Sequence, residues 1–351
     1  MEVIDALVHP QVSHRDELRR YMKEPLRRRP FPPPERYFYP NPLGDFLPEA
    51  ASASGAPGSD PSLVSEALHR DARPDAVVLL PLTRGLLPDV ELGSAVCAAT
   101  NDWLADVWLD KGNAHGKFRG TIRVNPMDPS GAVREIERWA EHPYMVQIGI
   151  PTQAHAPYGQ RFYHPIWEAA ERHDLPVAVH LDNGSGVDFP PTMTGYARHF
   201  VEYSVLSPIN YSFHLASLIA EGTFERSPGL RFVFTDGGVD VLQPLIWRLT
   251  KDWWSTKVDT PWVAMEPGEY LREHVRFCIH RLEGPQADED MPSWAGAAHY
   301  ADLLMYGSRY PFWDYLAPSE AARRLPPDVG EKVFAGNAAG WYRLTESPKR
   351  P

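Results

Sequence analysis

The stretch FRGTIRVNPMDPSGAVREIERWAEHPYMVQIGI, residues 118–150, decides the fold class of this chain. It begins with a strand-forming run at residues 118–124 and ends with a second run at 145–150. Between them, residues 132–140 place apolar side chains at the three- and four-residue spacing of a helix with one buried face. A strand, a helix and a second strand in this order predict a parallel βαβ unit.

The same pattern recurs on both sides of this unit. Six further strand-like runs lie at residues 3–8, 76–80, 176–180, 231–235, 275–280 and 303–306. Segments whose apolar residues have helical spacing separate several of them, most clearly at residues 91–109 and 166–172. Eight strands alternating with helices predict an α/β protein with a (β/α)₈ (TIM) barrel. A doubly wound open sheet is the alternative, although no Gly-x-Gly-x-x-Gly motif follows the first strand to support a dinucleotide site.

One connection is far longer than the others. About 65 residues, 10–74, join the first two strands, whereas most such connections are short. Within this connection, residues 25–61 form an insertion rich in proline, glycine and small residues. One interpretation is a partly disordered surface segment; the other is an ordered lid or oligomer contact on the loop side of the barrel. Five aromatic residues argue against pure disorder: Phe31, Tyr37, Phe38, Tyr39 and Phe46. We expect residues 1–351 to form a single barrel domain that carries this insertion.

The composition limits the classes of partner. Hydrophobic residues make up 43% of the chain and charged residues 23%, which is typical of a globular protein with a sizeable core. The formal charge of −11 argues against nucleic acid or an anionic membrane as the main partner, because both bind basic surfaces. Only two cysteines are present, and neither a secretory signal nor a membrane-length apolar run is visible. We therefore expect a cytoplasmic protein with reduced cysteines.

Polar side chains follow most of the predicted strands. In a parallel barrel the carboxyl ends of the strands meet at one mouth, where functional side chains collect. The residues at or just after these ends are His9, Asn125, His180, Asp236, His280 and Arg309. A single histidine at such a position is more often structural than functional. Together, however, His9, His180 and Asp236 have the composition of a two-histidine, one-carboxylate metal site.

Several short segments follow one another in a recognisable order. They are IDALVHP (4–10), NDWLA (101–105), PVAVH (176–180), DGG (236–238), PLIWRL (244–249), YGSRYP (306–311) and GNAA (336–339). In this order they resemble the amidohydrolase-2 family of the amidohydrolase superfamily, which includes aminocarboxymuconate-semialdehyde decarboxylase and related hydrolases and decarboxylases. The resemblance runs from residue 3 to about residue 344 and is weakest across 25–61. Its motifs specify the fold and the superfamily but not the substrate.

The resemblance implies a barrel with one divalent metal, usually zinc or manganese. Family ligands come from an acid-or-His-x-His motif on the first strand, a histidine on the fifth and an aspartate on the eighth. By resemblance, His9 and His180 match two of these ligands. Asp236 matches the sixth-strand position, where a histidine or glutamate assists catalysis in the family.

Three positions depart from the family pattern. Leu7 replaces the first acid or histidine, Arg309 replaces the metal-binding aspartate, and Phe312 stands where histidine is common. Leucine has no ligand atom, and arginine stays protonated and would repel a dication. Because each ligand contributes to affinity, losing two of them predicts a degenerate, weakened metal site. We expect the Arg309 guanidinium to point inward, close to the family's metal position, and to pair with Asp236.

Three functional hypotheses follow. The first is a non-catalytic or support subunit, either a homodimer or a hetero-oligomer with an intact paralogue. The second is a metal-dependent hydrolase or decarboxylase of a small carboxylate or amide, with zinc or manganese on His9, His180 and Asp236. The third is a metal-free enzyme or anion-binding protein in which Arg309 grips a carboxylate and His180 or Asp236 moves protons. In the active alternatives the catalytic residues are Asp236, Arg309 and His180. The expected substrate-binding residues are then Arg309, His280 and Asn125.

Overall fold

The computed structural model describes residues 2–14, 16–30, 41–52, 55–83, 87–182, 195, 197–279 and 282–344. Eight strands form one sheet in the order of the sequence, each parallel to the next. The strands are β1 Ile4–Val8, β2 Ala76–Leu79, β3 Phe118–Arg123, β4 Met145–Pro151, β5 Val177–His180, β6 Phe232–Phe234, β7 Val275–Cys278 and β8 Leu304–Met305. Every predicted strand is present, with ends that differ by one or two residues. The sequence prediction of a (β/α)₈ barrel is confirmed.

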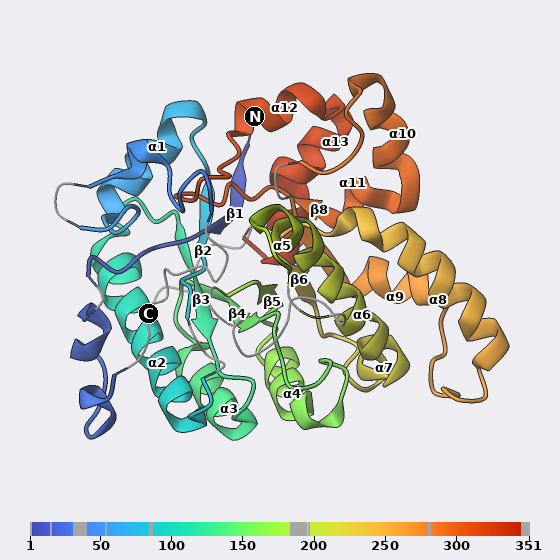
Figure 1. The fold of residues 1–351 in the computed structure, drawn as a ribbon, viewed down its shortest axis with the longest axis horizontal. Helices are drawn as coiled ribbons and strands as arrows, with labels where there is room; N and C mark the ends of the chain where they lie inside the picture. Colours follow the sequence, from blue (N-terminus) through green and yellow to red (C-terminus); the bar gives the residue numbers. More distant parts are fainter. Residues whose placement is uncertain are drawn as a thin grey trace.

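Helices alternate with these strands and surround them (Figure 1). In chain order, those before β6 are α1 Pro61–Asp71, α2 Val90–Trp103, α3 Pro129–Trp139, α4 His164–Arg172, α5 Phe200–Leu206, α6 Asn210–Ala220 and α7 Thr223–Arg226. Those after β6 are α8 Leu242–Thr256, α9 Pro267–His274, α10 Met291–Gly296, α11 Tyr300–Leu303, α12 Pro318–Arg324, α13 Pro327–Glu331 and α14 Asn337–Trp341. The predicted helices at 91–109, 132–140 and 166–172 correspond to α2 with its π-helical extension Leu104–Lys111, to α3 and to α4.

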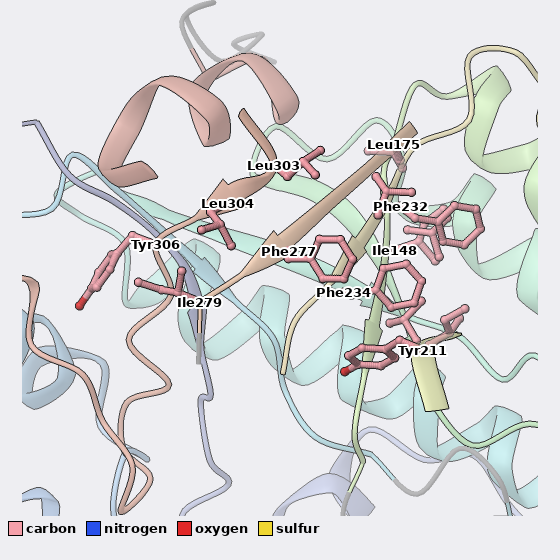
Figure 2. Close-up of a cluster of buried hydrophobic side chains, with 14 of the residues drawn as sticks. Ile148, Leu175, Tyr211, Phe232, Phe234, Phe277, Ile279, Leu303, Leu304 and Tyr306 are labelled. Carbon is pink, nitrogen blue, oxygen red and sulfur yellow. The ribbon is translucent and has the colours of Figure 1, made fainter. Parts of the chain in front are cut away.

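Side chains alternate between two apolar layers, as expected from the two-residue period of a strand. On β6, Phe232 and Phe234 pack toward the helices, and Phe234 stacks on Phe277 of β7 with ring centroids 5.5 Å apart. Figure 2 shows these rings beside Ile148 and Tyr211. Val233, between the two phenylalanines, belongs instead to a second buried cluster with side chains from β1, β2 and β8. The layers hold the strand ends in fixed positions.

The barrel closes between its first and last strands through a few specific bonds. The Ala6 N–H donates to the Tyr306 carbonyl at 2.8 Å, and the Arg309 N–H donates to the Leu7 carbonyl at 2.9 Å. The carboxylate of Asp5 accepts from the N–H groups of Leu7 and Ser308. This seam turns the segment that carries Arg309 across the mouth of the barrel.

Part of the long insertion returns to the barrel mouth. The Leu47 N–H donates to the Pro311 carbonyl, and the Trp313 N–H donates to the Asp45 carbonyl. The Phe46 ring stacks on that of Phe312, with centroids 5.3 Å apart. Phe31, Tyr37, Phe38 and Tyr39 lie outside the described residues. Within the described ranges, no helix is long and apolar enough to cross a bilayer.

Candidate functional site

Four of the predicted site residues meet at the mouth of the barrel. His9 follows β1, His180 ends β5, Asp236 comes two residues after β6, and Arg309 follows β8. All four are buried, and the exposed fraction of Arg309, the most accessible, is 8%. The parallel barrel explains this convergence, because it brings the carboxyl end of every strand to the same face.

His9 presents one nitrogen atom to the interior. Its Nδ1 lies 2.9 Å from the Leu80 carbonyl oxygen, which can only accept, so we assign the proton to Nδ1. Its Nε2 then carries a lone pair and has no hydrogen-bond partner among the described residues. Burial, reinforced by the charges of His180 and Arg309, holds the pKa of His9 well below its usual value. His9 is therefore a neutral imidazole, and the lone pair on its Nε2 is available for a ligand.

His180 lies between two carboxylates. Its Nδ1 is 3.5 Å from Asp182 Oδ1, and its Nε2 is 3.5 Å from Asp236 Oδ1. Its ring centroid is 4.7 Å from that of His9. Both contacts with carboxylates are longer than ordinary hydrogen bonds, so His180 is held by its surroundings rather than by a strong bond.

The sequence reasoning missed a buried ion pair on one side of His180. The Arg123 guanidinium, at the end of β3, binds the carboxylate of Asp182, and both side chains are fully buried. The Thr83 hydroxyl donates to the same carboxylate at 3.3 Å. Arg123 ends β3, and Asp182 comes two residues after the end of β5. Asp236 and Arg309 were identified from the same kind of position, at or just after a strand end.

Arg309 points inward and holds two carboxylates. Its Nη1 is 2.9 Å from Asp236 Oδ1 and 3.4 Å from Asp314 Oδ2. The pairing with Asp236 confirms the expectation from the sequence. The backbone φ of Arg309 is +59°, a left-handed conformation that is uncommon for arginine and directs the side chain into the mouth. Its guanidinium carbon lies 5.6 Å from the centroid of the Phe312 ring.

Asp236 is bonded on both of its oxygens. Oδ2 accepts from the Leu181 N–H at 2.7 Å and from the Tyr211 hydroxyl at 3.2 Å, while Oδ1 faces Arg309. Burial, together with the negative charge of Asp236, raises the pKa of Tyr211 well above its usual value. Tyr211 therefore remains a hydrogen-bond donor at any ordinary pH.

The fit of a divalent metal to these residues can be tested on their donor atoms. The Nε2 atoms of His9 and His180 are suitable donors without hydrogen-bond partners. However, the Asp236 oxygen nearest to them is bound to the Arg309 guanidinium, and Leu7 packs in the apolar core. In the part of the chain that the structure describes, no three His, Cys, Asp or Glu side chains are arranged to hold a metal ion. This arrangement of residues does not fit a divalent metal.

A pocket opens beside Arg309. Its lining includes the charged residues Asp236, Arg309 and Asp314. The other lining residues, half of them aromatic, are Leu181, Phe200, Tyr203, Ser204, Ser207, Pro208, Tyr211 and Trp313. Most of them belong to α5, the following turn Ser207–Ile209 and the start of α6. The pocket therefore brings aromatic side chains next to the Arg309 guanidinium and its two carboxylates.

One predicted substrate-binding residue, Asn125, is not part of this arrangement. The Asn125 amide donates to the Val90 carbonyl at 3.0 Å and to the Ser94 hydroxyl at 3.3 Å, so it fixes the start of α2. Asn125 is absent from the lining of the pocket beside Arg309. His280 lies outside the described residues, and its role stays a prediction.

A family model for amidohydrolases matches residues 84–344, a range that begins after β2 and so leaves out His9. A curated relative is the gamma-resorcylate decarboxylase of Rhodococcus jostii (strain RHA1), 25% identical over 190 residues. The alignment covers 50% of this chain and 54% of that enzyme. The chain thus matches about half the length of this relative.

Two solved structures share the fold over almost their whole length. An amidohydrolase from Mycobacterium avium subsp. paratuberculosis K-10 superposes with a TM-score of 0.75 at 21% identity, covering 97% of each chain. A 5-carboxyvanillate decarboxylase from Novosphingobium aromaticivorans DSM 12444 gives a TM-score of 0.66 at 20% identity, covering 98% of this chain and 96% of that one. The second structure is a complex with manganese and 4-hydroxy-3-methoxy-5-nitrobenzoic acid. At these identities the likeness shows the fold alone.

Proposed function

This chain belongs to the amidohydrolase family, and we propose that it is a member in which the Arg309 guanidinium takes the place of the divalent metal. On this proposal the barrel acts as a non-catalytic or support subunit rather than as a metal-dependent hydrolase or decarboxylase. The observation that carries the proposal is the 2.9 Å contact between Arg309 Nη1 and Asp236 Oδ1.

A guanidinium can replace a metal as a charge but not as a catalyst. Its positive charge keeps Asp236 and Asp314 together in a buried site, where unpaired carboxylates would be costly. It has no open coordination position, so it cannot bind a water molecule and lower its pKa, or polarise a bound oxygen, as a metal does. The replacement would therefore preserve the architecture of the mouth and remove its metal chemistry.

The test compares the metal content of the wild-type protein with that of Arg309→Asp. This substitution restores the family's eighth-strand aspartate beside His9 and His180, and aspartate tolerates the left-handed backbone better than arginine does. Both proteins are purified without chelator, incubated with Mn²⁺ or Zn²⁺, desalted and analysed by mass spectrometry for metals. We expect no stoichiometric metal in the wild type and about one ion per chain in Arg309→Asp.

The matched control is Arg309→Asp combined with His180→Ala, which should lose the acquired metal. Circular dichroism establishes that all three proteins are folded. About one ion per wild-type chain, lost when His180 alone is replaced by alanine, would overturn the proposal and reinstate His9, His180 and Asp236 as a metal site.

Metal-dependent decarboxylation is the second candidate function. The Nε2 atoms of His9 and His180 are buried without hydrogen-bond partners among the described residues, so a cation that displaced Arg309 from Asp236 would find two nitrogen ligands there. A relative named as a decarboxylase and a manganese-containing structural neighbour supply the substrate class, a small aromatic carboxylate. Release of CO₂ from hydroxybenzoates by the manganese-treated wild type, abolished by chelation, would support this function against the first.

A metal-free site in which Arg309 grips a substrate carboxylate has less support. Arg309 already faces Asp236 and Asp314, so an incoming carboxylate would have to displace one of them. Like-charge repulsion at this distance disfavours the exchange.

A further inference from the structure

The segment 45–47 of the long insertion, which we call the strap, pairs with the loop that follows β8. The Trp313 N–H donates to the Asp45 carbonyl at 3.2 Å, and the Leu47 N–H donates to the Pro311 carbonyl at 3.0 Å. An antiparallel bridge joins the middle residues of the two segments, between these bonds. The strap is therefore fastened at the mouth of the barrel by a short β-pairing.

Phe312 connects the strap to the inside of the mouth. Its ring stacks on that of Phe46, with centroids 5.3 Å apart and planes at 14°. The same ring meets the His9 imidazole edge-on, with centroids 5.0 Å apart. Phe312 is 1% exposed and His9 is fully buried. Phe46 and Phe312 therefore cover the imidazole whose Nε2 atom has no hydrogen-bond partner among the described residues.

The loop held by the strap also lines the pocket beside Arg309. Trp313 and Asp314 come directly after Phe312, and both belong to the pocket lining. Asp314 Oδ2 is 3.4 Å from Arg309 Nη1, and the Trp313 ring meets that of Phe200 on α5 with centroids 5.9 Å apart. Because the Trp313 N–H is bonded to the strap, a movement of the strap reaches this pocket as well as His9.

Few contacts hold the strap closed. Leu43, two residues before it, is 70% exposed, and a Cβ atom added at Gly44 would meet no atom within 4 Å. The Asp45 carboxyl has no ion-pair or hydrogen-bond partner among the described residues, and burial raises its pKa. The ionised form of Asp45 is therefore destabilised where the strap is closed. A segment with few buried contacts opens locally at a lower free energy than the whole protein unfolds.

We propose that the strap is a lid over the His9 side of the mouth, and that its local opening withdraws Phe312 and admits small molecules to His9 and His180. In the closed structure these two imidazoles are 0% and 1% exposed, so solvent does not reach their Nε2 atoms. Of the roles expected for the insertion from the sequence, a disordered segment, a lid or an oligomer contact, these contacts favour the lid. This role concerns access to the mouth and does not rest on the proposed replacement of a metal by Arg309.

Chemical modification of histidine tests the proposal, because diethyl pyrocarbonate acylates an imidazole nitrogen only where it can reach that atom. Peptide mass spectrometry measures the rate at His9, with His199, whose side chain is 65% exposed, as the internal standard. We expect Phe46→Ala to raise the rate at His9 about tenfold, because it removes the stacking that holds Phe312. Asp45→Asn should lower the rate, since a neutral amide costs less to bury than a carboxylate.

Amide hydrogen exchange provides a second measurement. The N–H groups of Leu47 and Trp313 make the two bonds of the strap, so both should exchange faster in Phe46→Ala, while the amides of β4 keep their wild-type rates. The matched control is Leu43→Ala, a truncation of the same kind in the same insertion at a side chain that is 70% exposed. It should leave both measurements unchanged.

An unchanged modification rate at His9 in Phe46→Ala would overturn the proposal. Equal acceleration in Leu43→Ala would also overturn it, because the insertion as a whole would then be loosened. Faster exchange throughout β4 in Phe46→Ala would do the same, because global unfolding would then expose His9. Metal content enters none of these measurements, so the lid and the proposed function can fail independently.

Discussion

His214 shows at the residue scale how hydrogen bonding fixes the protonation state of a buried side chain. Its Nδ1 accepts from the Tyr158 N–H at 3.2 Å, and its Nε2 lies 2.6 Å from the Thr152 carbonyl oxygen, to which it donates. A protonated ring would direct a second N–H toward the Tyr158 N–H. Burial accordingly lowers the pKa of His214 to about 4. The same reasoning assigns the neutral form to His9, whereas Arg309 keeps its charge and requires carboxylate partners.

The lowered pKa of His214 predicts a loss of stability in acid. In the unfolded chain the histidine pKa is near its model value of 6.5, so the unfolded state binds more protons as the pH falls toward 4. We expect this residue to remove roughly 2 kcal/mol of unfolding free energy between about pH 7 and about pH 5. Urea denaturation at both pH values checks this. His214→Gln should be less stable than the wild type at neutral pH, and the difference should shrink in acid; a constant difference would contradict the assignment.

At the element scale, β4 depends on a glycine that makes room for β3. A Cβ atom at Gly149 would lie 2.6 Å from Thr121 Cγ2 and 2.9 Å from Arg123 Nη1. Because Arg123 binds Asp182 beside His180, this close approach of two strands also helps to form one side of the mouth. The backbone of β4 is therefore part of the support for the site.

Substituting this glycine should destabilise the protein. We expect Gly149→Ala to cost about 1–3 kcal/mol, because the added methyl group overpacks a fully buried contact. The matched control is Gly340→Ala in α14, where an added Cβ meets no atom within 4 Å. That change should be neutral or stabilise by up to about 1 kcal/mol, since alanine favours a helix more than glycine does. Equal urea midpoints for the two variants would show that β4 accommodates the methyl group.

At the scale of the whole molecule, closure of the barrel places an acid inside the protein. Asp5 receives N–H groups from Leu7 and Ser308 at the seam between β1 and the segment after β8. Burial raises the pKa of Asp5 from 3.8 to about 6, although these hydrogen bonds oppose the shift. The folded state therefore binds a proton more tightly than the unfolded state does.

Asp5 and His214 change the stability of the protein in opposite directions as the pH rises. The stability that Asp5 contributes is fully present below the unfolded pKa of 3.8 and is lost as the pH rises through about 6. We expect Asp5→Asn, which keeps an oxygen acceptor and carries no charge, to be more stable than the wild type at neutral pH by about 1–3 kcal/mol. The gain should vanish near pH 4 in a thermal denaturation series. A destabilised variant at neutral pH would show instead that the ionised carboxylate is required at the seam.

Local pattern by itself determined the eight strands and the four residues that converge in the mouth. All strands of a parallel barrel run in the same direction, so their carboxyl ends meet at one mouth. His9, His180, Asp236 and Arg309 could therefore be placed together without knowing any contact between them. The family resemblance then placed Arg309 close to the family's metal position, and the need of a buried guanidinium for a carboxylate predicted its pairing with Asp236.

Only the tertiary structure decided which partners complete the site. The pairing of Arg123 with Asp182 and the stacking of Phe46 on Phe312 join segments far apart in the sequence, and the turn after Arg309 brings Asp314 back to its guanidinium as a second carboxylate. Asn125 stands near a strand end like the others, yet its amide binds the backbone at the start of α2. Periodicity fixes the face on which a side chain lies, whereas the atom that it meets depends on how distant elements pack and which buried polar groups remain to be satisfied.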